Sequence, residues 1–301
     1  MKTSTLEVGG RGVAVTNLEK VLYPPSGFTK AEVIDYYVRV GAVLLPHLKD
    51  RALTLKRYPN GVAAPFFYEK EAPAHRPTWV KTGAVWSESN GRDIHYVLVN
   101  DLATLVWTAN LASLELHTPL GRWRTPTRPT MVVFDLDPGD GTTIVKCCEV
   151  AQWLRRILEK MDLQAFPKTS GSKGLQVYLP LNSPATFDRT KAFAHAVAAT
   201  IAQERADVVT EMSRQLRKGK LFIDWSQNSP HKTTVSVYSL RATPKPSVST
   251  PITWAEVEKC ARLRDPKILG FSPADVLQRI KRKGDLFAPV LQLKQKLPRL
   301  G

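Results

Sequence analysis

The sequence predicts a protein of the α+β class, in which helices and short antiparallel strands are mixed along one chain. Stretches with apolar residues at helical spacing recur from one end of the chain to the other. Short apolar runs bounded by Gly, Pro and Asn lie between them and read as strands joined by turns. The 301 residues are 43% hydrophobic and 23% charged, which is typical of a globular protein with a sizeable core.

The first part of the chain is expected to combine two helices with strands. A capping-box pattern, Thr29 to Glu32, starts the first helix, and Asp101 is the expected N-cap of the second. The expected elements are a helix over 29–46, a strand over 52–57, a turn over 58–61, a strand over 96–99 and a helix over 101–116.

The rest of the chain is expected to mix helices with hairpins. The expected elements are a loop over 118–130, a strand over 131–134, a helix over 142–161, a strand pair around 171–174, a helix over 187–204, strands over 221–224 and 233–240, and helices over 254–263 and 273–283. The loop is the best internal boundary. We therefore expect subdomains 1–120, 121–250 and 251–301 that together form one structural unit.

The charge balance bears on the partners of the protein. The formal net charge is +16, which favours a polyanion such as nucleic acid, then an anionic membrane surface, over a basic surface without a partner. No stretch approaches the ~20 apolar residues of a membrane span, so a cytoplasmic protein without a membrane partner is expected. Three cysteines, two of them adjacent, indicate neither a disulfide framework nor a zinc site.

The segment FDLDPGDG places two carboxylates at the end of an apolar run. Asp135 and Asp137 stand two residues apart, so on a strand they face the same side. Without a cation they repel each other, and hard oxygen ligands suit Mg²⁺ or Mn²⁺. Two such ions bound by shared carboxylates are typical of phosphoryl and nucleotidyl transfer. The alternative is an acidic strand end that caps a Pro-Gly turn.

Two further stretches favour the metal interpretation. The turn in KTSGSKGLQVY offers backbone amides together with Ser170, Ser172 and Lys173 to phosphate oxygens, although a flexible hairpin has the same composition. In LFIDWSQN a second apolar run ends in Asp224, which is either a third metal ligand or a residue that satisfies a turn.

These three stretches, in this order, resemble the archaeo-eukaryotic primase superfamily, and more narrowly the polymerase domain of bacterial DNA ligase D and its stand-alone relatives. The segments TNLEKVLYP, KRYPNGV, LELHTP and TTVSVYSLRA extend the resemblance over nearly the whole chain. The resemblance implies a catalytic sheet like that of RNA-recognition motifs, packed with an N-terminal α/β subdomain. It also implies metal-dependent, template-directed addition of nucleotides, preferentially ribonucleotides, to a 3′ hydroxyl at gaps and breaks that carry a 5′ phosphate.

The resemblance also assigns roles to individual residues. The metal ligands, and thus the catalytic carboxylates, are expected to be Asp135, Asp137 and Asp224. The contacts to the incoming nucleotide are expected from Lys56, His117, Ser170, Ser172, Lys173, Gln176, Gln227 and Arg241. The 5′ phosphate of the downstream strand is expected at Lys20 and Lys30, and the template base against Phe67 and Tyr68, of which only one is expected to touch nucleic acid.

One departure from the family pattern concerns Gln176, which stands where relatives usually carry His. Glutamine donates a hydrogen bond but carries no charge, so weaker binding of the triphosphate is expected. The charge pattern adds a strip that is expected to follow the DNA backbone or to be a solvated loop: Arg214, Arg217, Lys218 and Lys220.

Three functions remain open on the sequence alone. The first is a repair polymerase acting in end joining or gap filling near the bacterial nucleoid, with DNA and nucleoside triphosphates as substrates. Its expected partners are an ATP-dependent DNA ligase, as a domain or a separate chain, and a DNA-end-binding protein. The second is a de novo primase with the same site. The third is a catalytically weak module that bridges DNA ends. Ligation by this chain itself is not expected, because no KxDG nucleotidyl-lysine motif is present.

Overall fold

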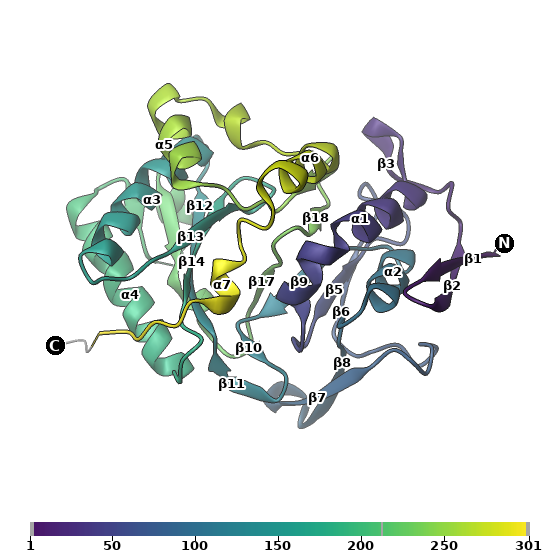
Figure 1. The fold of residues 1–301 in the computed structure, drawn as a ribbon. Coiled ribbons are helices and arrows are strands. Elements are labelled where there is room, and N and C mark those ends of the chain that lie inside the picture. The colour runs from purple at the N-terminus through teal and green to yellow at the C-terminus, as the bar shows by residue number, and fades with distance from the viewer. Residues whose placement is uncertain (1–2, 212, 299–301) are drawn as a thin grey trace. The chain divides into compact units, whose positions relative to one another are not determined.

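The computed structural model describes residues 3–211 and 213–298. The chain is organised as two compact units, each assembled from segments distant in sequence (Figure 1). Unit 1 consists of Met1–Pro126, Thr233–Val248 and Ser272–Gly284, and unit 2 of Thr127–Lys232, Ser249–Phe271 and Asp285–Gly301. In the part of the chain that is described, none of the helices has the length and apolar character needed to cross a membrane.

Unit 1 contains most of the short strands. Its strands are β1 (Thr3–Val8), β2 (Arg11–Thr16), β3 (Val21–Tyr23), β4 (Phe28–Thr29), β5 (Thr54–Arg57), β6 (Phe67–Glu69), β7 (Thr82–Ser87), β8 (Arg92–Val97), β9 (Ser113–Pro119), β10 (Gly121–Arg122), β17 (Thr233–Val235), β18 (Leu240–Arg241) and β19 (Ser247–Val248). Its helices are α1 (Lys30–Leu48), α2 (Leu102–Asn110) and α6 (Pro273–Lys283). Strand β11 (Thr125–Pro129) leads into unit 2.

The central sheet of unit 1 has the order β17-β9-β5-β6 and is antiparallel. Helix α1 packs against α2 and begins at the predicted capping box, in which Thr29 and Glu32 bond to each other's backbone amides. The hydroxyls of Tyr36 and Tyr37 donate to the backbone carbonyls of Tyr238 and Leu114, at 2.8 and 2.7 Å. These bonds attach α1 to β9 and to the later segment Thr233–Val248 that helps to complete the unit.

Unit 2 is built on one five-stranded sheet of order β13-β14-β12-β16-β15. The strands are β12 (Met131–Pro138), β13 (Phe166–Thr169), β14 (Leu175–Pro180), β15 (Val208–Val209) and β16 (Leu221–Asp224). All pairs are antiparallel except β15 with β16. The helices are α3 (Ile144–Glu159), α4 (Phe187–Glu204), α5 (Trp254–Leu263) and α7 (Pro289–Gln292).

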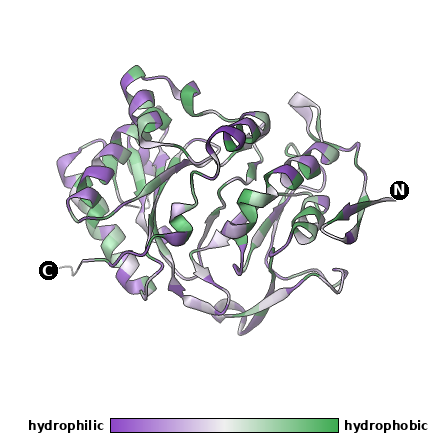
Figure 2. Cartoon of the chain, in the orientation of Figure 1, coloured by the Kyte–Doolittle hydropathy of each residue, from purple (hydrophilic) through white to green (hydrophobic). Residues whose placement is uncertain are grey.

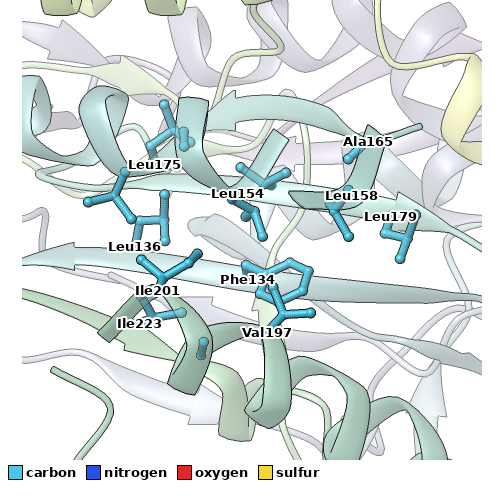
Figure 3. Close-up of a cluster of buried hydrophobic side chains, with 14 of the residues drawn as sticks. Phe134, Leu136, Leu154, Leu158, Ala165, Leu175, Leu179, Val197, Ile201 and Ile223 are labelled. Carbon is cyan, nitrogen blue, oxygen red and sulfur yellow. The ribbon is translucent and has the colours of Figure 1, made fainter. Parts of the chain in front are cut away.

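The two faces of this sheet have different roles. On β12 the side chains of Val132, Phe134 and Leu136 enter a fully buried apolar cluster with residues of α3 and α4, such as Leu154 and Val197 (Figure 3). Because side chains alternate along a strand, Asp135 and Asp137 belong to the opposite face. The buried apolar face thus fixes which way the carboxylates point, since a slip of one residue would bury them in the core.

The predicted elements are largely present. The strand expected over 131–134 extends to Pro138 and so includes both aspartates, and the strand expected over 96–99 is Arg92–Val97. Three other elements differ more. The helix expected over 101–116 ends at Asn110, because Ala112 adopts a left-handed backbone (φ 57°) that reverses the chain into β9. The loop expected over 118–130 contains β10 and β11. The strand expected over 233–240 is interrupted, since Tyr238 also has a positive φ of 64°.

The helix expected over 273–283 is α6, and it is largely hydrophilic (Figure 2). It buries only Pro273, Val276 and Leu277, and its last turn carries Lys281, Arg282 and Lys283. Basic residues at a helix C-terminus interact favourably with the helix dipole, so this charge run has a structural explanation. The three-part division 1–120, 121–250 and 251–301 stays a prediction.

Candidate active site

A row of polar side chains crosses four strands on the face of the unit 2 sheet opposite the apolar cluster with α3 and α4. Lys168 on β13 is paired with Gln176 on β14, Gln176 with Asp135 on β12, and Asp135 with Asp224 on β16. Directly paired residues of neighbouring strands share one face. Asp137 lies on the same face one pleat further along β12. Two carboxylates that are far apart in the sequence, Asp135 and Asp224, are thus cross-strand neighbours.

This arrangement places Asp135 in an unfavourable electrostatic environment. Burial, followed by the nearby charges of Asp137 and Asp224, raises the pKa of Asp135 to about 8. A hydrogen bond from Gln176 acts in the opposite direction. A carboxylate held among other carboxylates either binds a proton or requires a cation. The donor set therefore fits a hard divalent cation bound by oxygen ligands.

Asp224 is bonded within the turn that follows it. Its Oδ1 accepts the backbone amide of Ser226 at 3.0 Å, and its Oδ2 accepts Nε2 of Gln227 at 3.1 Å. The ammonium of Lys232 lies 3.7 Å from Oδ2 and also donates to the Ser226 hydroxyl. In residues 3–211 and 213–298, no three His, Cys, Asp or Glu side chains adopt an arrangement that would hold a metal ion. The participation of Asp224 as a ligand stays a prediction.

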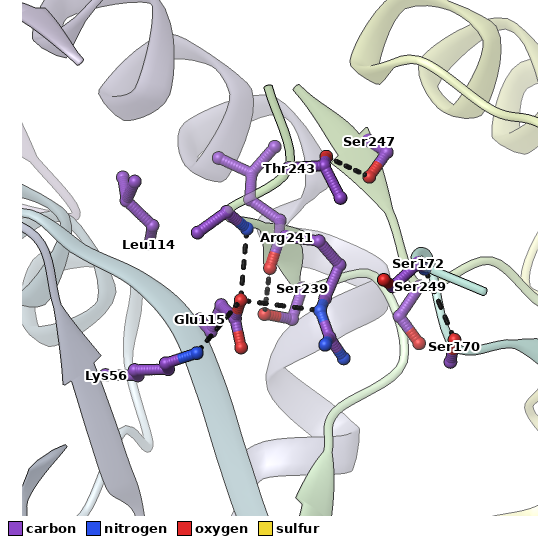
Figure 4. Close-up of polar contacts among 12 residues, drawn as sticks. Lys56, Leu114, Glu115, Ser170, Ser172, Ser239, Arg241, Thr243, Ser247 and Ser249 are labelled. Carbon is purple, nitrogen blue, oxygen red and sulfur yellow. Dashed lines mark hydrogen bonds and ion pairs between the residues drawn. The ribbon is translucent and has the colours of Figure 1, made fainter. Parts of the chain in front are cut away.

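The turn between β13 and β14 is folded around Ser170. The Ser170 hydroxyl accepts the backbone amide of Ser172 at 3.2 Å (Figure 4). It also accepts the backbone amide of Gly174 at 3.1 Å, so it shapes the turn. A Cβ on Gly174 would lie 2.5 Å from the carbonyl oxygen of Leu136 and 3.3 Å from Oδ1 of Asp137. Glycine is required there because the turn lies directly against the acidic end of β12. The side chains of Ser172 and Lys173 remain exposed.

A 380 Å³ cavity opens beside this turn. It is lined by the Pro138–Ile144 segment, by Ser172 and Lys173, and by Pro266, Leu269 and Gly270. The predicted phosphate contacts Ser172 and Lys173 therefore border open space next to the segment that follows Asp137. Gln176 is 3% exposed and accepts a hydrogen bond from Lys168, so its contact with a nucleotide stays a prediction.

The basic strip before β16 is held close to the acidic strand end. The guanidinium of Arg217 stacks on the ring of Phe222 at 3.6 Å, and the backbone carbonyl of Lys220 accepts the amide of Gly139 at 2.9 Å. Lys218 is exposed. The side chain of Arg214 lies outside the described part of the chain. The contact of the strip with a DNA backbone stays a prediction.

Unit 1 contains a second charged cluster, centred on Glu115 (Figure 4). Oε1 of Glu115 lies 3.8 Å from Lys56 Nζ and 3.5 Å from Arg241 Nε, and Oε2 lies 2.9 Å from Nε2 of His117. The structure thus brings together three of the predicted nucleotide contacts from separate segments. Burial alone would raise the pKa of Glu115, but the hydrogen bond from His117 and the charge of Arg241 outweigh it and lower the pKa to about 2.

Burial lowers the pKa of His117 and outweighs the attraction of Glu115. Above that pKa the imidazole is neutral, so the cations that balance Glu115 near neutral pH are Lys56 and Arg241. The sequence reasoning missed Glu115, although it lies in the quoted segment LELHTP. The available signal was an acidic residue placed between two leucines of an expected apolar segment, Leu114 and Leu116, since a charged residue in such a place is seldom without a partner.

Exposed aromatic side chains adjoin this cluster. Phe66, Phe67 and Tyr68 are 47%, 44% and 54% exposed, so both members of the predicted pair are accessible. The sequence reasoning did not single out Phe66, whose ring centroid lies 4.1 Å from Lys56 Nζ. The contact of Phe67 or Tyr68 with a template base stays a prediction.

Lys20 and Lys30 are neighbours. The backbone amide of Lys30 donates to the carbonyl of Lys20 at 2.8 Å, and the Lys30 ammonium donates to the carbonyl of Thr16 at 2.6 Å. Burial and the charges of Lys20 and Arg57 lower the pKa of Lys30 to about 8. Lys20 donates to Asn60 Oδ1 at 2.8 Å. Mutually repelling cations of this kind favour binding of a dianion such as a 5′ phosphate, which stays a prediction.

Comparisons with known proteins identify the family. The sequence matches the primase-polymerase domain of LigD over residues 29–287. It is 41% identical over 281 residues to the multifunctional non-homologous end joining protein LigD of Mycolicibacterium smegmatis, covering 92% of this chain and 36% of that protein. It is 32% identical over 271 residues to the bifunctional non-homologous end joining protein LigD of Bacillus subtilis, covering 89% of this chain and 42% of that protein.

The structure is similar to the polymerase domain of ligase D from Mycobacterium tuberculosis, solved in complex with DNA. The two structures superpose with a TM-score of 0.86, and the match covers 93% of this chain and 98% of that chain. The two sequences are 39% identical. This similarity confirms the mixed α/β fold that the sequence predicts. The chain belongs to the LigD primase-polymerase domain family, whose members are metal-dependent, DNA-directed nucleotidyltransferases.

Proposed function

We propose that this chain is a template-directed polymerase that extends a primer 3′ hydroxyl at gaps and double-strand breaks, with a preference for ribonucleotides, in end-joining or gap-filling repair. The observation that carries the proposal is the acidic end of β12, where Asp135 and Asp137 share a face with Asp224 and adjoin the turn that presents Lys173. Carboxylates beside a phosphate-binding turn are the groups that nucleotidyl transfer requires.

Each group of residues has a distinct proposed role. Asp135, Asp137 and Asp224 would hold two divalent ions, Mg²⁺ or Mn²⁺, which supply activation of the 3′ hydroxyl and charge neutralisation at the leaving pyrophosphate. Ser172 and Lys173 donate to the phosphates of the incoming nucleotide. No side-chain nucleophile takes part, so the protein contributes position and charge.

Further proposed contacts come from the other charged clusters. Glu115 keeps Lys56, His117 and Arg241 in place as contacts to the nucleotide. Lys20 and Lys30 bind the 5′ phosphate beyond a gap, and the exposed ring of Phe67 or Tyr68 stacks on a template base. The Lys and Arg residues of the 214–220 segment follow the DNA backbone, which gives a salt-dependent contribution to affinity.

The proposal is tested by primer extension on a gapped duplex. The downstream strand carries either a 5′ phosphate or a 5′ hydroxyl, and rNTPs are compared with dNTPs in Mg²⁺ and in Mn²⁺. Template-directed incorporation that is stronger with rNTPs and stimulated by the 5′ phosphate supports a repair polymerase. Extension without any primer would identify a de novo primase instead. Tight DNA binding without incorporation in either metal would identify an end-bridging module.

The relatives also bear on partners. This chain spans 36% of the length of the M. smegmatis protein, which is named as multifunctional. We propose that the polymerase acts together with an ATP-dependent DNA ligase, present as a domain or a separate chain, and with a DNA-end-binding protein. Co-purification of either partner with this chain, retained after nuclease treatment, is the corresponding measurement.

A further inference from the structure

Lys168 is a fully buried lysine at one end of the polar row on the unit 2 sheet, with a relative exposure of 0%. Its ammonium donates to Oε1 of Gln176 at 2.6 Å and to the hydroxyl of Ser249 at 2.7 Å. A buried charge costs free energy unless it is well bonded, and these bonds supply that compensation. Because the side chain is buried, Lys168 itself has no access to substrate.

The ammonium determines how the amide of Gln176 is oriented. Lysine is a donor only, so the atom of Gln176 that faces it must be the carbonyl oxygen Oε1. The hydroxyl of Tyr178 lies 3.4 Å from the same oxygen. The NH₂ group of Gln176 is therefore directed away from Lys168. It is available to the residue paired with Gln176 on the other side, which is Asp135.

Gln176 is the direct cross-strand partner of Asp135, and a hydrogen bond from its side chain lowers the pKa of that carboxyl group. Lys168, Gln176 and Asp135 thus form a chain of directed hydrogen bonds across β13, β14 and β12. Ser249 extends the chain at its far end, because its hydroxyl donates to the carbonyl of Thr169 at 3.0 Å.

We propose that Lys168 is a positioning residue for nucleotidyl transfer, which acts by locking the Gln176 amide so that its NH₂ group orients the Asp135 carboxylate. This inference rests on the proposed function. A glutamine without this lock has two amide orientations of similar energy, one of which would turn its carbonyl toward Asp135. Residues that orient a ligating carboxylate contribute to metal affinity and activity without touching the substrate.

The primary test compares Lys168→Met, Gln176→Met and the double variant with the unchanged chain. Lys168→Met is expected to lower kcat about 10- to 100-fold while KM for the nucleotide changes less than about threefold, as for loss of an orienting group. The double variant is expected to be no slower than Gln176→Met, because Lys168 acts through Gln176. The exposed Lys160→Met, which removes the same charge, is the control and is expected to leave kcat unchanged.

A second readout does not depend on turnover. Calorimetric titration with Mn²⁺ alone is expected to give about tenfold weaker binding for Lys168→Met than for the unchanged chain or Lys160→Met. The thermal unfolding temperature serves as the folding check, since exchange of a buried charge for an apolar side chain of similar volume is often neutral. If the unchanged chain fails to extend primers, the proposed function is wrong. The comparison of Mn²⁺ affinities would still test whether Lys168 orients Asp135 through Gln176.

Gln176→Glu is the variant to use if Lys168→Met does not fold. It keeps the size of the side chain and an acceptor for Lys168, but it has no N–H for Asp135. It is expected to show the same loss of kcat and of Mn²⁺ affinity. Unchanged kcat and Mn²⁺ affinity in Lys168→Met or Gln176→Glu would overturn the inference. The inference would also be overturned if the fold-losses of kcat in Lys168→Met and Gln176→Met multiplied in the double variant, because the two residues would then act independently.

Discussion

Gly139 and Arg217 approach each other so closely that a Cβ on Gly139 would lie 1.7 Å from the carbonyl oxygen of Arg217. The amide of Gly139 also donates to the carbonyl of Lys220 at 2.9 Å. The glycine that follows the two aspartates thus allows the basic 214–220 segment to lie against the acidic end of β12. Gly139, the last residue of the DxDPG motif, therefore allows two backbone segments to approach each other closely.

Gly139→Ala is therefore expected to displace the basic segment. A contact this short cannot be relieved by a side-chain rotation, so a loss of stability of about 2 kcal/mol or more is expected. Thermal or urea unfolding measures it. Gly270→Ala is the matched control, because the nearest atom to its added Cβ is 3.6 Å away and the variant should unfold like the original chain. Equal stability of the two variants would contradict the close contact.

Asp137→Asn separates activity from stability. Loss of the carboxylate is expected to abolish primer extension while leaving the affinity for gapped DNA largely intact. It also relieves the repulsion that Asp137 exerts on Asp135, so the unfolding temperature in EDTA is expected to rise. Asp140→Asn, which removes a carboxylate that is not among the proposed metal ligands, is the control and should retain primer extension. Retained extension activity in Asp137→Asn would remove this residue from the proposed catalytic group.

Glu115→Gln is expected to lower stability in a pH-dependent manner. The folded-state pKa of Glu115 is about 2, below the usual 4.5, so its charge stabilises the fold above about pH 4.5. This contribution is lost as the pH falls from about 4.5 toward 2, and it amounts to at most about 3 kcal/mol. Unfolding of both proteins between pH 3 and 7 should show a gap that narrows in acid. The exposed Glu159→Gln, from an ion pair with Arg155, should show no such gap.

Lys30→Met tests how the stability of the fold depends on pH in the alkaline range. The folded-state pKa of Lys30 is about 8 instead of 10.5, because of burial and the charges of Lys20 and Arg57. Below pH 8 the lysine is charged in both states and its burial penalty is constant. Between pH 8 and 10.5 only the unfolded state stays protonated, so the original chain gains up to about 3 kcal/mol relative to Lys30→Met.

Chemical unfolding at pH 7, 8, 9 and 10 measures this gain, with the exposed Lys49→Met as the control. If the difference in the free energy of unfolding between the original chain and Lys30→Met stays constant over this range, the pKa of Lys30 is not lowered in the folded state. The same variant should lose the stimulation of primer extension by a downstream 5′ phosphate, whereas Lys49→Met should keep it.

The elements that could be predicted from the sequence are those specified by local patterns. The capping boxes, the 3.6-residue periodicity and the apolar runs located α1, α3, α4, α5 and α6 and the strands that carry Asp135 and Asp224. The helix expected to reach residue 116 stopped at Asn110, since only the tertiary pairing of β9 with β5 and β17 shows where the strand must begin. Local propensity does not contain that information.

The sequence by itself determined the family and located the carboxylates and the Ser/Gly-rich turn, because these are short segments in which the residue types carry the chemistry. Only the tertiary structure decided which residues surround them. Glu115 became the counter-charge of Lys56 through the pairing of β9 with β5, and of Arg241 through the later 233–248 segment. Lys168 became the neighbour of Gln176 through the register of the β13–β14 hairpin. Register is fixed by burial of the apolar face of each sheet, and the polar partners on the other face follow from it.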